Sequence, residues 1–230
     1  MSLSHGPSVV TQGLVLALDA ADRNSYPGSG TTWTDLSGNG NNGSLVNGVG
    51  YSGNNGGSLS FDGVNDYVNV GNVQTYFPGP IISGAIDFWI KPGVINANDI
   101  YIGMQNPYGN RIYIGNYLGL WDVGFGSFAW NGGFIGTRQS VTLSWTNVCL
   151  NITSGSAKLY INGIETITKT TDTTVSMTGV FPIGGYLFEG TFDNTNMGSS
   201  NISSVKIYNR ALTASEIQQN FNATRSRYGI

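Results

Sequence analysis

The sequence predicts an all-β sandwich with long polar loops and one short helix, and two observations support this fold class. The 230 residues include 34 Gly, 25 Asn, 23 Ser and 20 Thr, residue types that favour turns, loops and strands over helix interiors. Short segments rich in β-branched and aromatic residues recur at intervals of about 8 to 15 residues, each bounded by Gly, Asn or Pro, which is typical of a sandwich. With 40% hydrophobic and 12% aromatic residues, the chain can bury enough apolar surface to fold.

The expected strands follow from alternation and β-branched runs. Asn162-Gly163 supplies two residues that tolerate positive φ, so we expect a tight hairpin turn there. The predicted strands are 14–19, 57–61, 66–70, 84–91, 100–104, 111–115, 118–123, 140–145, 147–152, 157–161, 164–168, 180–184 and 202–208.

One helix is predicted over residues 214–221, with Thr213 as its N-cap. Glu216 lies three residues after Thr213 and completes a capping box, while Leu212 and Ile217 are placed as a hydrophobic staple. By helical spacing, one face would contact the sandwich and the other would face water. The first face holds Ile217 and Phe221, and the second holds Gln218, Gln219 and Asn220.

Charge and composition exclude several classes of partner. The net charge is −3, and the 10 Lys and Arg residues are scattered singly, so the chain lacks the basic surface that nucleic acid requires. No apolar run is long enough to insert in a membrane, and residues 1–13 lack the features of a signal peptide. We therefore expect synthesis in a cytoplasm. Cys149, the single cysteine, lies in a strand-like run and is expected to be a buried hydrophobe.

No composition shift or linker divides the strands into two groups. We therefore expect an N-terminal arm over residues 1–12 and a single domain over residues 13–230. The arm contains Pro7, lacks helical periodicity and ends in the β-branched run 9–11. Such an arm suits attachment to a neighbouring chain, either as an added strand or lying along it.

Five segments, taken in order, resemble the laminin G-like members of the concanavalin A-like lectin and glucanase superfamily. They are SLSFDGVNDYVNVG (58–71), AIDFWIKP (85–92), SWTNVCLNI (144–152), AKLYINGIE (157–165) and ISSVKIYNRALTASEIQQNF (202–221). The resemblance implies a jelly-roll sandwich of two antiparallel sheets. In this superfamily, the concave face and the rim loops bind glycans in some members and proteins in others.

The opening segment 4–48 and the ending 220–230 are similar to laminin G-like structural proteins of tailed bacteriophages. This resemblance implies a virion protein that is made in the host cytoplasm and displayed on the capsid, as a decoration or fibre protein, or on the tail. Its expected partners are other virion proteins and further copies of itself, a trimer being one option.

Catalytic residues are not expected. A glycosidase of this superfamily needs two closely spaced carboxylates, and the sequence has no E-x-D-x-E run. The only histidine, His5, lies in the arm, where nothing would orient it for nucleophilic catalysis. We therefore predict that the chain is not an enzyme.

Two loops are candidate Ca²⁺ sites because they gather hard oxygen donors. The first contains Asp35 and Asn39, and the second contains Asp62, Asn65 and Asp66. The competing interpretation is that these side chains bond their own backbone in tight turns. Many family members carry acidic residues before the IYNRAL strand, where this chain has Ser203 and Ser204, so a family calcium site that uses those positions is not expected here.

Aromatic side chains are the candidate glycan contacts. Trp89 and Trp145 are assigned to packing and Trp33 to one end of the sandwich. The remaining stretch is more aromatic than one sheet face can easily bury, so it lines a glycan or partner surface, packs against a neighbouring subunit or belongs to the core. Its members are Tyr117, Trp121, Phe125, Phe128 and Trp130, with Asn131 beside them.

Three functional hypotheses follow. The first is a non-enzymatic virion structural protein that also binds host-surface glycans. The second is a stand-alone lectin for adsorption to cell-surface polysaccharide, and the third is a glycoside hydrolase.

Overall fold

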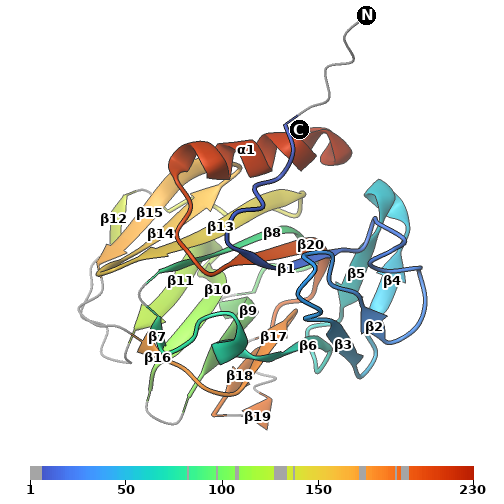
Figure 1. Cartoon of the computed structure of the whole chain (residues 1–230), viewed down its shortest axis with the longest axis horizontal. Coiled ribbons are helices and arrows are strands. Elements are labelled where there is room, and N and C mark those ends of the chain that lie inside the picture. Colours follow the sequence, from blue (N-terminus) through green and yellow to red (C-terminus); the bar gives the residue numbers. More distant parts are fainter. Residues whose placement is uncertain are drawn as a thin grey trace, which may run out of the picture.

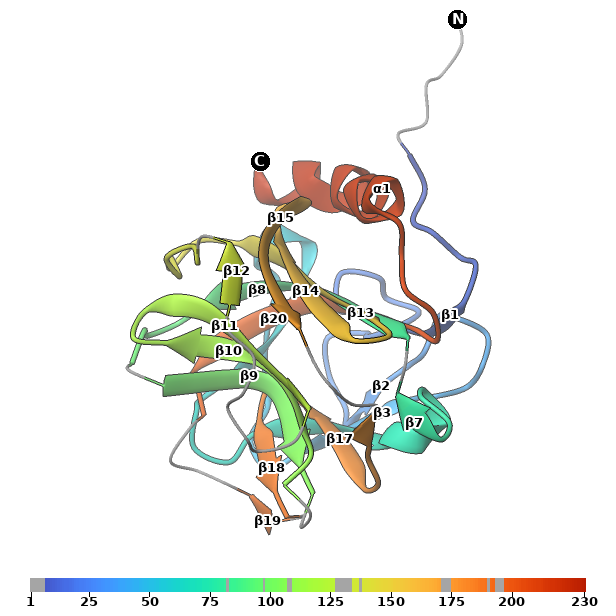
Figure 2. The same cartoon turned by 90° about the vertical axis from the view of Figure 1, so that its left-hand side faces the viewer.

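The described residues form a sandwich of two sheets that face each other across one hydrophobic core, with a single α-helix on the outside (Figures 1 and 2). The structure is a computed structural model, and it describes residues 7–81, 83–96, 98–106, 109–126, 134–136, 138–170, 175–189, 191–192 and 197–230. This architecture confirms the predicted all-β concanavalin A-like sandwich with one short C-terminal helix. No helix within the described ranges has the length and apolar character needed to cross a membrane.

Sheet A has an antiparallel path of eight strands, and β1 (Leu14–Asp19) pairs with its strand β20. The path runs β12 (Phe134–Gly136), β15 (Ile164–Thr170), β14 (Ser156–Ile161), β13 (Thr146–Thr153), β8 (Gly84–Pro92), β20 (Ser200–Tyr208), β5 (Ser58–Phe61) and β4 (Gly50–Ser52).

Sheet B faces sheet A, and β18 (Tyr186–Phe188) runs parallel to its strand β9 while pairing with β19 (Thr191–Phe192). The main path runs β11 (Leu120–Gly126), β10 (Arg111–Tyr117), β9 (Asn98–Gln105), β17 (Val180–Ile183), β6 (Tyr67–Asn72), β3 (Gly43–Val46) and β2 (Thr32–Trp33). A small separate ladder joins β7 (Pro80–Ile81) to β16 (Val175–Ser176).

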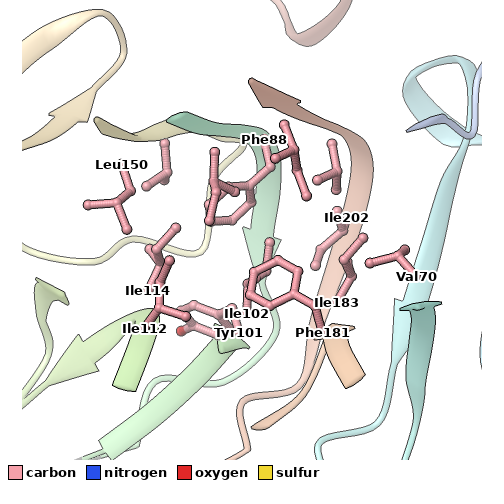
Figure 3. Close-up of a cluster of buried hydrophobic side chains, with 14 of the residues drawn as sticks. Val70, Phe88, Tyr101, Ile102, Ile112, Ile114, Leu150, Phe181, Ile183 and Ile202 are labelled. Atoms are coloured by element: carbon pink, nitrogen blue, oxygen red, sulfur yellow. The ribbon is translucent and has the colours of Figure 1, made fainter. Parts of the chain in front are cut away.

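The core fills the space between the sheets, because strand alternation turns every second side chain inward. Figure 3 shows Phe88 and Leu150 of sheet A opposite Ile112 and Ile114 of sheet B. Trp33 was expected at one end of the sandwich; it lies on β2, the last strand of sheet B, and is fully buried in the same cluster.

The predicted strand 140–145 is wrong. Only Ser140 makes a bridge, to Leu120, and residues 141–145 form no ladder. The segment is instead tied to the β10–β11 hairpin by single backbone bonds, among them Val141 N to Gly119 O at 2.8 Å. An alternating pattern is not sufficient for a strand where the neighbouring edge offers no continuous partner. The other predicted strands are confirmed, with bounds that differ by up to three residues.

Helix α1 (Ala214–Thr224) covers the outer face of sheet A and ends in the 3₁₀ turn η3 (Arg225–Tyr228) (Figure 1). The predicted capping box is present, since the Thr213 hydroxyl accepts from Glu216 N and the Glu216 carboxylate accepts from Thr213 N. Leu212 and Ile217 pack in one cluster, as expected for the staple. The prediction that Asn220 faces water is wrong: this side chain is 1% exposed, because it bonds buried polar groups of sheet A.

The outer face of sheet A buries polar and aromatic groups beneath α1. Trp89 is buried, as predicted for packing, but outside the sandwich core, stacked on Tyr228 with ring centroids 4.0 Å apart. Trp145 is half-buried beside the same tyrosine. Cys149 is fully buried, as expected, and burial raises the pKa of its thiol.

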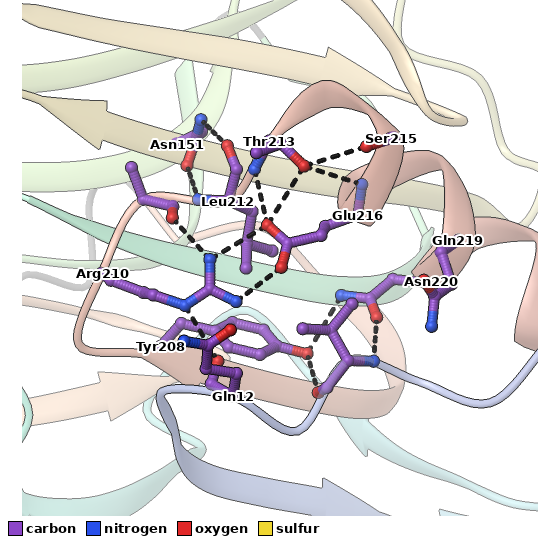
Figure 4. Close-up of polar contacts among 12 residues, drawn as sticks. Gln12, Asn151, Tyr208, Arg210, Leu212, Thr213, Ser215, Glu216, Gln219 and Asn220 are labelled. Atoms are coloured by element: carbon purple, nitrogen blue, oxygen red, sulfur yellow. Dashed lines mark hydrogen bonds and ion pairs between the residues drawn. The ribbon is translucent and has the colours of Figure 1, made fainter.

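The described part of the predicted arm lies along this covered face (Figure 4). Val10 is buried, its N–H donates to Asn220 Oδ1 at 2.8 Å, and its carbonyl accepts from the Tyr208 hydroxyl at 3.0 Å. Gln219 donates to Ser8 O at 2.7 Å. Residues 8–10 therefore pack against the body of the domain.

Two further 3₁₀ turns complete the described elements. These are η1 (Asn54–Gly56) and η2 (Val73–Thr75), and Asn72 caps the second through Gln74 N.

Candidate functional site

The predicted aromatic surface is divided between the two faces of sheet B. Trp121 and Phe125 are 1% and 4% exposed and belong to the core, so of the alternatives given for this stretch the core holds for both and the binding surface does not. Tyr117, by contrast, is 39% exposed at the end of β10. Alternation explains the division, since residues 121, 123 and 125 of β11 point inward. Phe128, Trp130 and Asn131 lie outside the described residues.

The first predicted calcium loop is a tight turn closed by its own carboxylate. Asp35 Oδ1 accepts from Ala17 N and Ser37 N, both at 2.9 Å, and Oδ2 accepts from Asn41 N at 3.0 Å. Asn39 donates through Nδ2 to Ser37 Oγ at 2.9 Å. These bonds match the competing interpretation, in which the side chains satisfy backbone donors of the turn.

The second predicted loop lines a pocket of about 180 Å³, together with Gly48, Gly50, Ser60 and Phe61. Both Asp62 and Asp66 contribute to its wall. Each carboxylate also bonds backbone: Asp66 Oδ1 accepts from Gly48 N at 2.7 Å, and Asp62 Oδ1 accepts from Val64 N at 2.7 Å.

Asn65, the third predicted ligand of this loop, does not line the pocket, and neither do the two serines at the family's acidic positions. Asn65 is exposed, and its carbonyl accepts from Asn47 Nδ2. Ser203 is fully buried and donates to Gly57 O at 2.7 Å, while Ser204 is also buried. Among the residues that the structure describes, no three His, Cys, Asp or Glu side chains come together as a metal-binding group would require.

A polar and aromatic cluster occupies the outer face of sheet B, opposite the core. Ile112 and Ile114 of β10 point inward, which turns Arg111, Tyr113 and Tyr117 outward. We call the five side chains Arg111, Tyr113, Tyr117, Asp122 and Arg138 the tyrosine face.

Tyr113 is half-buried and lies across its neighbouring strands. A Cβ on Gly124 of β11 would overlap the tyrosine ring, and one on Gly103 of β9 would lie 2.5 Å from the Tyr113 Cβ. Glycines on both sides therefore let this ring lie close to the sheet.

One hydrogen bond fixes the Tyr113 ring, and a second one joins two residues of the neighbouring strands β18 and β9. The Tyr113 hydroxyl donates to Asp122 Oδ2 at 2.8 Å, and Asp122 is buried. On β18, beside Gly103, the buried Tyr186 donates to Gln105 Oε1 at 3.2 Å. The Tyr113 hydroxyl is therefore held by Asp122, and the bond between Tyr186 and Gln105 orders the strands next to it.

An arginine accompanies each tyrosine of the face. The Arg111 guanidinium carbon lies 5.5 Å from the Tyr113 ring centroid, and that of Arg138 lies 5.7 Å from the Tyr117 centroid. Arg138 also lies 3.4 Å from Asp122 Oδ1 and donates to Trp121 O at 3.3 Å. These distances are in the range of cation–π contacts.

The pKa values of the cluster follow from burial and from charge. Burial raises the pKa of the Tyr113 hydroxyl, and the adjacent Asp122 carboxylate raises it further. Burial lowers the pKa of the Lys169 amino group, the positive charge of Arg111 lowers it again, and Asp122 opposes both. The hydroxyl is therefore a hydrogen-bond donor, and Lys169 lies within the field of the same charges.

The sequence prediction missed Tyr113, Arg111, Asp122 and Arg138. The alternation of residues 111–115 could have indicated Arg111 and Tyr113. Because positions 112 and 114 are apolar and face the core, positions 111 and 113 must lie on the opposite face of the strand. The pairing of Asp122 with that face depends on the register of the hairpin, in which Gly115 faces Asp122.

The fold is a concanavalin A-like sandwich, and comparison of the sequence with family models agrees. Residues 61–218 match the model of the concanavalin A-like lectin/glucanases superfamily. The chain belongs to this family. Comparison with curated proteins finds no significant match.

Solved structures share the fold at low sequence identity. Domain 4 of AbnA, a GH43 extracellular arabinanase from Geobacillus stearothermophilus, solved with arabinotriose, has a TM-score of 0.65 at 19% identity and matches 91% of this chain and 98% of that domain. Trypanosoma rangeli sialidase in complex with sialic acid has a TM-score of 0.63 at 16% identity, and the match covers 96% of this chain and 35% of the sialidase. The binding domain of Paraclostridial Mosquitocidal Protein 1 has a TM-score of 0.64 at 20% identity, and the match covers 92% of this chain and 52% of that domain. The chain thus spans about a third of the sialidase.

Proposed function

We propose that the chain is a non-catalytic glycan-binding module displayed on a bacteriophage particle. The observation that carries the glycan part is the placement of Tyr113 and Tyr117 on one outer sheet face, each with an arginine beside it. Aromatic rings present apolar faces to sugar rings, while neighbouring polar groups bond the hydroxyls.

The spacing of the two rings favours an oligosaccharide over a single sugar. Residues 113 and 117 lie four positions apart on β10, which corresponds to about 13 Å along a strand. The solved complex of the AbnA domain with arabinotriose supports a glycan ligand for this fold.

The chemistry of the face favours binding without catalysis. Within the described part of this face, Asp122 is the one carboxylate, whereas a glycosidase of the usual type uses two. A tyrosine nucleophile would need a lowered pKa, and burial together with Asp122 raises the pKa of Tyr113. The proposal is therefore a lectin-type module and not a hydrolase.

Display on a virion is supported by the resemblance of residues 4–48 and 220–230 to phage structural proteins. In this proposal, the partners are other virion proteins and further copies of the chain, and the glycan lies on the host surface. A stand-alone lectin used for host adsorption is the alternative, and it shares the same binding face.

The binding proposal is tested by electrophoresis through gels that contain bacterial cell-surface polysaccharide. We expect retardation of the wild-type chain and its loss in Tyr113→Ala and Tyr117→Ala. Tyr51→Ala is the matched control, because Tyr51 is equally exposed, at 39%, on β4 of the other sheet. Equal retardation of all variants would place binding elsewhere, and no retardation of the wild type by any polysaccharide would refute glycan binding.

The display proposal is tested by immunogold labelling of purified particles from a culture that produces this chain. Regular copies on heads or tails are expected. Absence of the chain from particles would refute the virion part and leave the stand-alone lectin as the proposal.

A further inference from the structure

Segment 35–42, one of the two loops predicted to bind Ca²⁺, lies beside the open edge of β1. This strand pairs with β20 on one side, and no strand among the described residues pairs with its other side. The Ala17 N–H and C=O and the Val15 C=O are directed to the open side, since all three bond to segment 35–42. Without partners, such backbone groups are a template to which the strand of another chain can add.

The segment satisfies these backbone groups one by one. Asp35 Oδ1 accepts from Ala17 N at 2.9 Å, and Leu36 N donates to Ala17 O at 2.8 Å. Asn41 Nδ2 donates to Val15 O at 2.8 Å. Two side chains and one backbone N–H therefore take the positions that a neighbouring strand would fill.

Further hydrogen bonds hold the segment in this position. Asp35 is 8% exposed, and its carboxylate also accepts from Ser37 N at 2.9 Å and from Asn41 N at 3.0 Å. Asp35 N donates to Asn42 Oδ1 at 2.9 Å, which closes the loop. The same carboxylate thus bonds the edge of β1 and the turn that carries it.

Side-chain partners also end the sheet at this edge. A side-chain oxygen satisfies a backbone N–H without presenting a second row of backbone groups to which a further strand could pair. Residues 35–42 form no strand themselves, so the sheet does not continue beyond them. The two interpretations of this loop at the sequence level, a Ca²⁺ site and a tight turn, did not include this relation to β1.

We propose that segment 35–42 covers the edge of β1 and thereby prevents a second copy of this chain from adding a strand there. A second copy fits this edge because two antiparallel β1 strands, related by a two-fold axis near Ala17, would exchange the N–H and C=O bonds of that residue reciprocally. The inference concerns contacts between copies of the chain and does not depend on glycan binding.

Hydrogen exchange of the ¹⁵N-labelled full chain, followed by NMR, reads the Ala17 amide directly. In the wild type, this amide should be protected to the same extent at every protein concentration. Asp35→Ala removes its acceptor, so we expect exchange to be about tenfold faster in dilute solution. Raising the concentration should restore the protection, and sedimentation velocity on the same samples should then show a dimer.

A second variant keeps the test decisive if Asp35→Ala does not fold. Ser37→Ala combined with Asn41→Ala removes both side-chain donors to Val15 O and leaves the backbone N–H bonds of the Asp35 carboxylate in place. This double variant should also form a dimer at concentrations at which the wild type does not.

Asp62→Ala is the matched control, because Asp62 Oδ1 likewise accepts a backbone bond in its own turn, from Val64 N at 2.7 Å. It should keep the wild-type exchange of Ala17 and the wild-type sedimentation. Unchanged protection of Ala17 in Asp35→Ala would show that the carboxylate does not cover the edge. Loss of protection without a dimer at any concentration, or a dimer in which the Ala17 amide still exchanges fast, would show that no second copy adds at β1. Each of these results overturns the proposal and leaves the proposed function standing.

Discussion

Asn220 connects the helix, the sheet and the N-terminal segment through buried hydrogen bonds (Figure 4). Its Nδ2 donates to Asp87 Oδ2 and to the Tyr208 hydroxyl, both at 3.0 Å, and its Oδ1 accepts from Val10 N at 2.8 Å. Asp87 is fully buried, and its other oxygen accepts from Asn147 Nδ2 at 2.8 Å. A buried carboxylate depends on such donors, because it has lost its hydration.

Replacing Asn220 by Ala should lower the free energy of unfolding by about 2 to 4 kcal/mol, since one oxygen of Asp87 and the Val10 N–H lose their partners. Urea unfolding measures the change. Asn222→Ala is the matched control on the same helix, because Asn222 is exposed, and it should change stability by less than about 0.5 kcal/mol. Similar losses in both variants would contradict the assignment.

The Glu216 carboxyl, at the N-terminus of α1, makes the stability of the folded state depend on pH. The Arg210 guanidinium, followed by the Thr213 backbone N–H, lowers the pKa of Glu216 to about 2 from its ordinary 4.5. A lowered carboxyl pKa stabilises the folded state above the unfolded pKa, and this stabilisation is lost as pH falls from about 4.5 to about 2. The thermal midpoint should therefore fall across this window, and Glu216→Gln should flatten part of the fall. An unchanged pH profile in the variant would show that the pair does not contribute.

Two hairpins of this chain use the same two-residue turn with different residues. Asn162 and Gly163 have φ of 52° and 79°, and Leu118 and Gly119 have φ of 54° and 75°. Asn tolerates positive φ, whereas Leu is strained there, and Leu118 is also 65% exposed. The β10–β11 turn therefore carries an unfavourable residue beside the tyrosine face.

Leu118→Asn should raise the free energy of unfolding by about 0.5 to 1 kcal/mol, because the strain at positive φ is relieved. Thermal or urea unfolding provides the measurement. The reverse change at the other turn, Asn162→Leu, should destabilise by a similar amount or more, since Asn162 Oδ1 also accepts from Asn147 N at 2.9 Å. A loss of stability in Leu118→Asn would mean that the leucine makes contacts that outweigh its strain.

Local sequence patterns predicted most of the helices and strands, whereas a prediction failed where a residue's partners lie far away in the sequence. The capping box and the Asn162-Gly163 turn depend on residues near each other in sequence, and both are confirmed. Asn220 was assigned to water because its helical position is polar, but its partners Asp87 and Val10 are over a hundred residues away. The short strands β2, β3, β4, β7, β12, β16, β18 and β19 were not predicted, because two to four residues carry little periodicity.

The predictions for the candidate site also succeeded or failed according to how far they depended on strand pairing. Tyr117 was predicted as a contact residue and is exposed, whereas Trp121 and Phe125 are in the core because β11 turns them inward. The partnership of Tyr113 with Asp122 and Gly124 is created by hairpin register, which residue types alone do not specify.

The outer faces of the two sheets differ in what covers them. The outer face of sheet A is covered by α1 and by the described part of the N-terminal segment (Figure 2). The outer face of sheet B carries no α-helix among the described residues and presents the tyrosine face instead. The proposed ligand face is therefore the one that no described α-helix covers.

The measurement that tests glycan recognition most directly is an NMR titration of the ¹⁵N-labelled chain with oligosaccharides from a polysaccharide that retards it in gels. The account predicts that the largest shifts lie in β9, β10 and β11 around Tyr113 and Tyr117. Shifts centred on the pocket lined by Asp62 and Asp66 would contradict it, and so would shifts confined to α1.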